Sequence, residues 1–431
     1  MAFTRRQFLN RGAVLVAAGL TAPSFITRTA MALNGQLAQD AAPPDPTKAN
    51  NILVAVQLTG GNDGLNTLIP FGDPGYYQFR SSLAIPTTDV LALTDSVGLH
   101  PRLTGLKSLY DEGLVAAVQG VGYPNPNRSH FRSMDIWHTA RPDIIERTGW
   151  LGRYMDACQC GQTQPLPAVS AGDQLNSMFY AEHTLVPAVA SIGGFSLQTE
   201  SGDRNSRQIQ IQTLRNIYQQ AGNWPAHEAL MRQTALKALD GADQLAQAAG
   251  GYHSPVQYPT GNPLAAQLQM VAQIIAGDLG TRVFSVQLGG FDTHAVQFNQ
   301  QANLLGQLGE ALAAFQQDLA AMNKQDNVVM MTFSEFGRRV AQNGSNGTDH
   351  GTAEPMFVIG TRVVPGLYST YPRLEDLDDN GDLKFSTDFR NVYAAVLQDH
   401  MGVDPTPVLA GSYDPVKVIR PPYALPRVGP Q

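Results

Sequence analysis

An aspartate and a histidine two positions apart follow a short apolar run, about two thirds of the way along the sequence. The run begins near Ser285 and breaks at Gly289 and Gly290, and the pair is Asp292 and His294. Residues i and i+2 of an extended segment lie on the same side of the chain, so this carboxylate and this imidazole can bind one ion. Both groups are ligands of zinc and of other divalent metals. The pair therefore predicts one part of a metal site.

Three other apolar runs end in a comparable way, at a turn that precedes an ionisable or nucleophilic residue. These residues are Asp63 after the run 52–58, Ser129 after the run 114–121 and Glu335 after the run 327–333. In open α/β proteins, ligands bind at the carboxyl ends of the strands. Four such ends therefore predict a single site. For the stretch 62–64 taken alone, a polar turn is an equally good interpretation.

Ser129 lies where a helix is expected to begin, between Arg128 and Arg132. A serine at that position is commonly a helix N-cap. It can also be a nucleophile, because a helix N-terminus and two arginines would attract an anionic ester. Both interpretations stay open. His130, which follows directly, is a further candidate catalytic residue.

A glycine-rich loop at 343–352 carries a second acidic residue and histidine, Asp349 and His350. A lone loop histidine is more often a surface residue, but the pair at 292 and 294 favours a ligand here. The predicted metal ligands are Asp63, Asp292, His294, Glu335, Asp349 and His350. The expected ion is divalent, with zinc first and manganese or calcium as alternatives.

The segments between these runs predict helices and further strands. Residues 300–322 repeat Leu, Ala and Phe at helical spacing and are expected to pack in the core. Residues 200–280 are rich in Gln and Ala and predict a helical insertion, either a lid or a packing layer. A last amphipathic helix is expected at 388–401.

The composition argues against a nucleic-acid-binding protein. The chain has 431 residues, 43% of them apolar, which is ample for a large core. Four arginines lie between positions 1 and 32, so the remainder has 25 basic side chains (29 less these four) against 36 acidic ones. The sequence shows no basic patch of the kind that nucleic-acid binding requires.

The only two cysteines are Cys158 and Cys160. One intervening residue makes an awkward disulfide. We therefore interpret them as small apolar residues or free thiols, with metal binding as a minor alternative.

The N-terminal segment 1–32 has the pattern of an export signal. Residues 4–10 match the twin-arginine motif around Arg5 and Arg6, and a short apolar segment and the small residues 30–32 follow. The apolar segment is too short to span a bilayer, and the alternative is an amphipathic N-terminal helix of the fold. We predict a signal peptide at 1–32, a flexible leader at 33–50, export by the twin-arginine translocase, and a periplasmic or extracellular location. No later segment predicts a stable membrane span.

Residues 376–382 match the first half of a calcium-binding EF-hand loop. The position that needs a bidentate glutamate holds Thr387, so the second half fails. Asn380 and Gly381 between Leu377 and Leu383 predict a hairpin turn instead.

Six ordered motifs resemble those of domain-of-unknown-function family 1501, whose members are commonly exported by the twin-arginine route. They lie at 60–67, 128–131, 290–294, 335–338, 347–351 and 388–390. The family is placed in the sulfatase-like, alkaline-phosphatase superfamily. The resemblance therefore implies one α/β domain over 51–431, with a mixed, mainly parallel sheet sandwiched between helices and a metal cluster at the strand ends.

The resemblance also implies a role for each residue. Asp63 corresponds to the first metal aspartate, Ser129 to the helix-capping nucleophile, Asp292 and His294 to the later ligand pair, Glu335 to the following acid and His350 to the last histidine. Ser129 lacks the sulfatase signature, which argues against a formylglycine sulfatase. The pair at 292 and 294 is closer in sequence than in the superfamily, which favours a single metal or a degenerate site.

Two functions agree with this pattern. The first is an exported metal-dependent hydrolase of small phosphate or related anionic esters, in which Ser129 attacks and Arg128 or Arg132 holds the anion. The alternative is a non-catalytic exported protein that uses the same fold to bind a ligand or partner.

Overall fold

A nine-stranded sheet forms the centre of the computed structural model, which describes residues 50–160, 164, 166–192 and 204–420. The strands in spatial order are β11 (Gly366–Tyr368), β5 (Val115–Gly122), β10 (Glu354–Ile359), β9 (Val328–Phe333), β1 (Ile52–Thr59), β8 (Val283–Gly289), β6 (Ala168–Ala171) and β7 (Ala188–Val189), with β12 (Thr387–Asp388) paired to β5. Strand β10 is antiparallel to both of its neighbours, and the other pairs are parallel. The expected mixed, mainly parallel sheet is therefore confirmed.

The central strand β1 shows why these segments form strands. Its residues alternate between two apolar faces, with Val54 and Val56 in one buried cluster and Leu53 and Ala55 in the other. A strand that is covered on both faces by helices reads as a nearly continuous apolar run. Full burial of each larger aliphatic side chain contributes roughly 1.5–3 kcal/mol relative to exposure.

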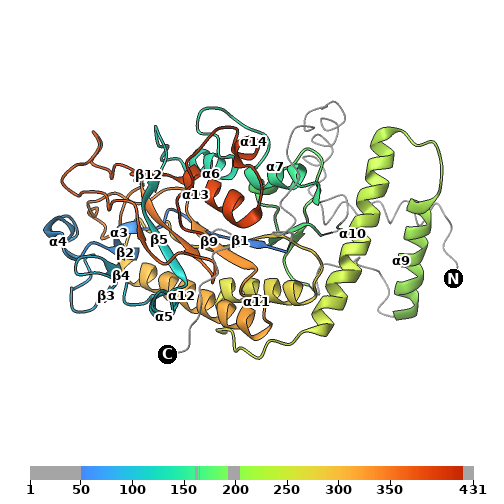
Figure 1. Cartoon of the computed structure of the whole chain (residues 1–431), viewed down its shortest axis with the longest axis horizontal. Helices are drawn as coiled ribbons and strands as arrows, with labels where there is room; N and C mark the ends of the chain where they lie inside the picture. Colours follow the sequence, from blue (N-terminus) through green and yellow to red (C-terminus); the bar gives the residue numbers. More distant parts are fainter. Residues whose placement is uncertain (1–49, 161–163, 165, 193–203, 421–431) are drawn as a thin grey trace.

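Helices cover both faces of the sheet (Figure 1). Those on one face are α5 (Thr104–Asp111), α11 (Pro263–Ala276) and α12 (Gln297–Ala321), and those on the other are α6 (His130–Thr139), α7 (Trp150–Ala157), α13 (Phe389–Ala395) and α14 (Pro405–Leu409). The two larger buried clusters of the core lie between the sheet and these two layers. The helix expected at 300–322 is thus present as α12.

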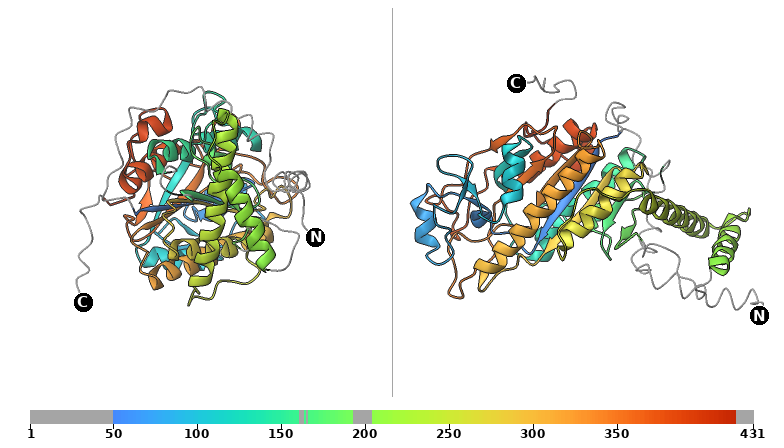
Figure 2. Two further views of the ribbon diagram at one scale, coloured as in Figure 1. Left: turned by 90° about the vertical axis from the view of Figure 1, so that its right-hand side faces the viewer. Right: turned by 90° about the horizontal axis from the view of Figure 1, so that it is seen from below.

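A smaller unit lies at one end of the sheet, next to α3 (Gly64–Thr67) and α4 (Pro74–Phe79). Its three short strands are β2 (Leu68–Ile69), β4 (Gly98–Leu99) and β3 (Leu91–Ala92), in that spatial order. At the other end, α9 (Arg204–Gln219) and α10 (Ala226–Gly251) form a pair that extends away from the body (Figure 2). Both belong to the segment predicted as a helical insertion, whereas α11 of that segment packs against α12 and β8.

Two sequence expectations are wrong. Cys158 and Cys160 form a disulfide, with their Cα atoms 5.2 Å apart. Gln159 between them has a positive φ of 55°, so the chain reverses at the end of α7 and brings the two side chains together. The segment 388–401 is buried nearly all round rather than amphipathic, because α13 and the π-helix η3 (Val396–Met401) lie in the core.

Other expectations have different outcomes. The hairpin turn is confirmed by the antiparallel bridge between Leu377 and Leu383. The signal peptide and the leader up to residue 49 lie outside the described residues. Among the helices that the structure describes, none combines the length and the apolarity needed to cross a membrane.

Candidate metal centre

The carboxyl ends of β1, β5, β8 and β9 lie along one edge of the sheet. Strands β1, β8 and β9 are parallel, and β5 runs in the same direction because β10 opposes both β5 and β9. The loops beyond β8 and β9 are held together by backbone bonds, including Thr348 N to Thr293 O (3.2 Å) and Val296 N to Ser345 O (3.0 Å). The fold therefore brings the loop at 343–351 next to the residues that follow β8.

Asp292 lies among three histidines. Its Oδ1 is 3.0 Å from His294 Nε2 and 3.2 Å from His350 Nε2, and its Oδ2 is 3.5 Å from His130 Nε2. Ligand atoms of His130, Asp292 and His350 all lie within 4.8 Å of one another. The structure thus brings together three of the residues predicted as metal ligands and adds His130, which we had predicted as catalytic.

The other ring nitrogen of each histidine is fixed by an oxygen. Nδ1 is 2.8 Å from Glu335 Oε1 in His130, 3.1 Å from Asp349 Oδ1 in His294, and 2.8 Å from the Arg128 carbonyl oxygen in His350. Carboxylate and carbonyl oxygens accept hydrogen bonds, so each Nδ1 carries the hydrogen. Each Nε2 is then left with a lone pair, which is the tautomer that a metal ligand needs.

The Nε2 atoms of His294 and His350 are only 2.9 Å apart. With both rings donating through Nδ1, two nitrogen lone pairs and an oxygen of Asp292 face one another. A positive charge among these atoms, from a metal ion or from a proton on one of the two Nε2 atoms, would stabilise this arrangement. Imidazole nitrogens and one carboxylate are also a ligand set typical of zinc. The residues therefore fit a divalent metal ion.

The electrostatics favour the metal-binding protonation states of His350, Asp292 and Asp349. Burial lowers the pKa of His350 below its ordinary value, and Arg338 and His130 add to this effect, so the ring is neutral. Burial alone would raise the pKa of Asp292, but the hydrogen bond and charge of Arg338 hold it below its usual range. The bond from Asn343 similarly lowers the pKa of Asp349. The side chains of Asp292 and Asp349 remain 48% and 51% exposed, so a small ligand can reach the centre.

Arg338 fixes Asp292 in place. Its guanidinium is fully buried, bonds Asp292 Oδ1 at 2.7 Å and also donates to backbone carbonyls at Gly61 (2.7 Å) and Thr348 (2.9 Å). These contacts join the loops beyond β1, β8 and β9. Gly60 permits the close packing, because it has a φ of 120° and a Cβ there would lie 2.4 Å from the Asp292 nitrogen.

Asp63 lies apart from this centre. It is fully buried and paired with Arg80 at 2.5 Å, and it accepts further hydrogen bonds from Gln297 and from the backbone of Asn66. Its carboxylate oxygens are therefore used by the protein itself. Glu335 is also buried, with Oε1 accepting from Gly60 N (2.9 Å) and from His130. Glu335 thus orients the ring of His130, as outer-shell carboxylates orient ligand histidines in metal sites.

Ser129 is the N-cap of α6, as expected, but its side chain makes no capping hydrogen bond, and the residue is exposed. The two arginines beside it are paired. Arg128 pairs with the buried Asp382, and Arg132 pairs with Asp135 and also bonds backbone carbonyls. The structure therefore leaves Ser129 accessible and directs both neighbouring guanidinium groups to protein partners.

Sequence reasoning missed two functional features. It predicted Glu335 as a ligand and His130 as catalytic, whereas in the structure His130 Nε2 faces Asp292 and Glu335 lies behind the His130 ring at Nδ1. It also assigned nothing to Arg338, although the residue lies in a motif that the resemblance used. The available signal was the position of Arg338, five residues after the end of the buried strand β9, where a charged side chain can be buried.

Several solved structures are similar in fold. One is a protein in the alkaline phosphatase superfamily from Vibrio parahaemolyticus, with 10% identity, a TM-score of 0.39 and coverage of 90% of this chain and 77% of that chain. Another is the alkaline phosphatase from the Antarctic bacterium TAB5, with 12% identity, a TM-score of 0.30 and coverage of 74% and 93%. A third is the C-terminal periplasmic domain of EcEptC from Escherichia coli, with 10% identity, a TM-score of 0.35 and coverage of 89% and 94%. At these scores the similarities carry no inference about activity.

No curated protein matches the sequence. The family model described as "Protein of unknown function (DUF1501)" matches residues 112–412, which is more than half of the chain. The chain belongs to the DUF1501 family.

Proposed function

We propose that the protein is a metal-dependent hydrolase of small anionic esters, phosphate esters above all. The observation that carries this proposal is the convergence of three histidine Nε2 atoms on Asp292, each ring fixed through Nδ1 by an oxygen. His130, Asp292 and His350 would hold the ion, with His294 as a further ligand. A divalent ion at this position would act as a Lewis acid that stabilises negative charge on an ester group.

Ser129 is the proposed nucleophile. It is the N-cap residue of α6, its side chain is exposed, and it directly precedes His130 in the chain. Attack of its Oγ on the phosphorus would displace the alcohol, with the serine proton lost to water and the alcohol taking a proton from water. Water would then hydrolyse the phosphoserine and regenerate Ser129. The first backbone N–H groups of α6 have no partner within the helix and favour an anion there.

The test uses the purified protein with aryl phosphate, phosphodiester and aryl sulfate substrates, each with added zinc, manganese or calcium. We expect turnover with at least one phosphate substrate, dependence on the metal, and loss of activity in Ser129→Ala and Asp292→Ala. Thr213→Ala, on the exposed face of α9, is a matched hydroxyl control that should keep full activity. Turnover that survives Ser129→Ala unchanged would rule out the serine mechanism.

A specific observation favours the second function, a non-catalytic ligand-binding protein. Both arginines expected to hold the anion are directed to protein partners, and Arg338 is buried. The two functions are separated by measuring metal content and turnover on one sample. Stoichiometric metal with no turnover on any substrate would support binding alone.

A further inference from the structure

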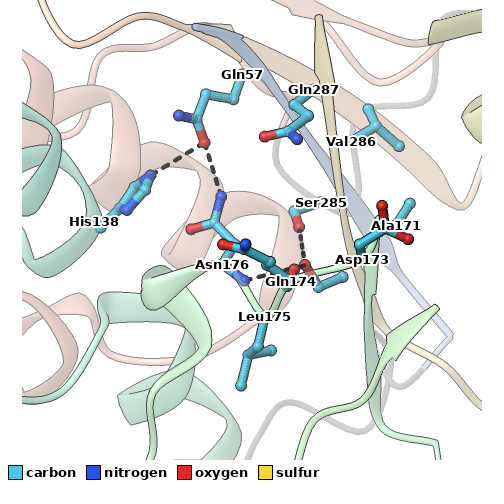
Figure 3. A pocket seen from close by; sticks show the side chains of 11 residues that line it. Gln57, His138, Ala171, Asp173, Gln174, Leu175, Asn176, Ser285, Val286 and Gln287 are labelled. Carbon is cyan, nitrogen blue, oxygen red and sulfur yellow. Dashed lines mark hydrogen bonds between the residues drawn. The ribbon is translucent and has the colours of Figure 1, made fainter. Parts of the chain in front are cut away.

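A cavity of about 440 Å³ lies on the sheet beside β1, β6 and β8 (Figure 3). Its polar lining residues are Gln57, His138, Ser170, Asp173, Gln174, Asn176, Ser285 and Gln287. Most of these groups are amides and hydroxyls, which carry no charge. Nothing in the proposed ester hydrolysis uses them.

The polar lining arises because the side chains on this face of the strands change from apolar to polar along the strand direction. On this face, β1 presents Leu53 and Ala55 and then Gln57, and β8 presents Val283 and then Ser285 and Gln287. The register places Gln57 beside Gln287 and Ala55 beside Ser285, so the change occurs side by side in the two strands. Strand β6 follows the same pattern, with Ala168 and then Ser170 next to Ser285. The apolar core therefore gives way to a polar wall near the carboxyl ends.

The deeper part of the wall is a connected hydrogen-bond network. Gln57 Oε1 accepts from Asn176 Nδ2 at 2.8 Å and from His138 Nε2 at 3.1 Å, and Ser285 Oγ lies 3.3 Å from Ser170 Oγ (Figure 3). Gln57, Ser170 and Ser285 are each only 3% exposed. Burial lowers the pKa of His138 to about 3, so its ring is neutral. The network fixes donors and acceptors in place without adding charge.

The mouth of the cavity holds polar side chains that have no hydrogen-bond partner among the described residues. These are Asp173, Gln174 and Gln287. Each is exposed, and the amides of Gln174 and Gln287 can both donate and accept. Of the described residues that line the cavity, none is a lysine or an arginine. The lining therefore disfavours an anion and suits a ligand with several neutral hydroxyl groups.

The cavity is separate from the metal centre. His130 and His138 lie at opposite ends of α6, eight residues apart, which corresponds to about 12 Å along a helix. Met134 lies between them on α6 and accepts a hydrogen bond from Gln57 Nε2 at 2.9 Å. A ligand in the cavity would therefore contact the C-terminal part of α6, and the metal would contact its first residue.

We propose that this cavity binds a small uncharged ligand rich in hydroxyl groups, of the size of a monosaccharide or a cyclic polyol. Planar amides and hydroxyls recognise adjacent hydroxyl groups because they donate and accept at once. A ligand without hydroxyl groups would cover the unpartnered amides of Gln174 and Gln287 without pairing them, so the site should discriminate by hydrogen bonds.

The test is saturation-transfer NMR and calorimetric titration of the full chain with glucose, galactose and myo-inositol, and with inorganic phosphate as the charged probe. We expect at least one neutral probe to bind with a Kd on the order of 1 mM. The double variant Gln174→Ala/Gln287→Ala should weaken binding by about tenfold or more, because two hydrogen bonds are lost. Gln317→Ala, an exposed glutamine of α12, is the matched control and should bind like the wild type.

The same titration on Asp292→Ala separates this proposal from the proposed function. Binding should be unchanged in that variant and should not compete with phosphate, whatever the protein does to esters. The proposal is overturned if none of the three neutral probes binds, if the double variant binds as well as the wild type, or if binding disappears in Asp292→Ala.

Discussion

Replacement of Glu335 by glutamine tests how the metal centre is built. Glu335 Oε1 accepts from Gly60 N at 2.9 Å and from His130 Nδ1 at 2.8 Å, and Oε2 lies 3.2 Å from Ser334 Oγ. Glutamine can keep its oxygen at the first position and donate from its nitrogen to Ser334 Oγ. The serine hydroxyl can accept, because it already donates to the Leu58 carbonyl at 2.5 Å. Glu335→Gln therefore removes one negative charge and little else.

The charge matters because it makes the His130 ring a more basic ligand. Changes to such outer-shell partners typically reduce metal affinity by 10–100-fold. Since the hydrogen bond itself is kept, we expect the lower end, about tenfold or about 1.4 kcal/mol of binding free energy. The assay is a competition between the protein and a zinc-chelating dye at pH 7, with the unfolding temperature measured by circular dichroism.

Glu354→Gln is the matched control. Glu354 is also buried beside Ser334, whose N–H donates to its Oε1 at 2.6 Å, but burial raises its pKa well above the ordinary value. Burial thus favours the neutral form of this acid, which glutamine matches in charge and shape, so zinc affinity should change far less than in Glu335→Gln. A second measurement places Glu335→Gln in a His130→Ala background, where it should have no further effect. An equal loss of zinc affinity in both backgrounds would show that Glu335 contacts the ion directly. It would refute the arrangement in which Glu335 acts through His130.

Three further predictions concern the surrounding structure. Arg80→Met leaves the carboxylate of Asp63 buried without its partner, so the free energy of unfolding in urea should fall by about 3–5 kcal/mol. Zinc affinity per folded molecule should stay unchanged. A large loss of zinc affinity would instead give Asp63 a role in the centre. His138 has a folded pKa of about 3 against an ordinary 6.5, so the unfolded chain alone takes up a proton as the pH falls below 6.5. Unfolding free energy should drop by about 2 kcal/mol between pH 7 and pH 5, and His138→Gln should show a correspondingly smaller drop in the same titration. Gly60→Ala places a Cβ 2.4 Å from the Asp292 nitrogen. Asp292 must then move, so zinc affinity should fall by about tenfold or more. Unchanged zinc affinity in the dye assay would contradict this close approach.

The strand ends could be predicted because their signal is local. An apolar run, a glycine and a polar residue recur in one order, and parallel strands in α/β folds carry such residues to one edge. Asp292 and His294 were predicted from this signal, whereas His350 was predicted from the glycine-rich loop at 343–352, and the structure places the three side chains together. Asp63 gives the same local signal but has a different partner, because the buried Arg80 lies at the end of α4 and nothing in the run at 52–58 reveals the pairing.

The features that sequence reasoning missed depend on orientation. His130 joins the centre because α6 begins at the carboxyl edge of the sheet, with its first side chain toward Glu335. The antiparallel direction of β10 between β5 and β9 has no sequence signal of its own, because a buried antiparallel strand and a buried parallel strand have the same apolar sequence pattern. The disulfide required the positive φ of Gln159, a residue type that rarely adopts it.

The residues of the candidate metal centre come from distant parts of the chain. His130 begins α6, Asp292 follows β8 and His350 lies in the loop beyond β9, so the unfolded polypeptide contains no preformed site. An ion that binds only the folded chain shifts the folding equilibrium by mass action, by about 2.7 kcal/mol when its concentration is 100 times its Kd. Metal binding would then be coupled to folding, and the compartment in which the chain folds would determine which ions it meets. If the twin-arginine leader acts as its sequence predicts, that compartment is the cytoplasm, and the protein would bind its metal ion before export.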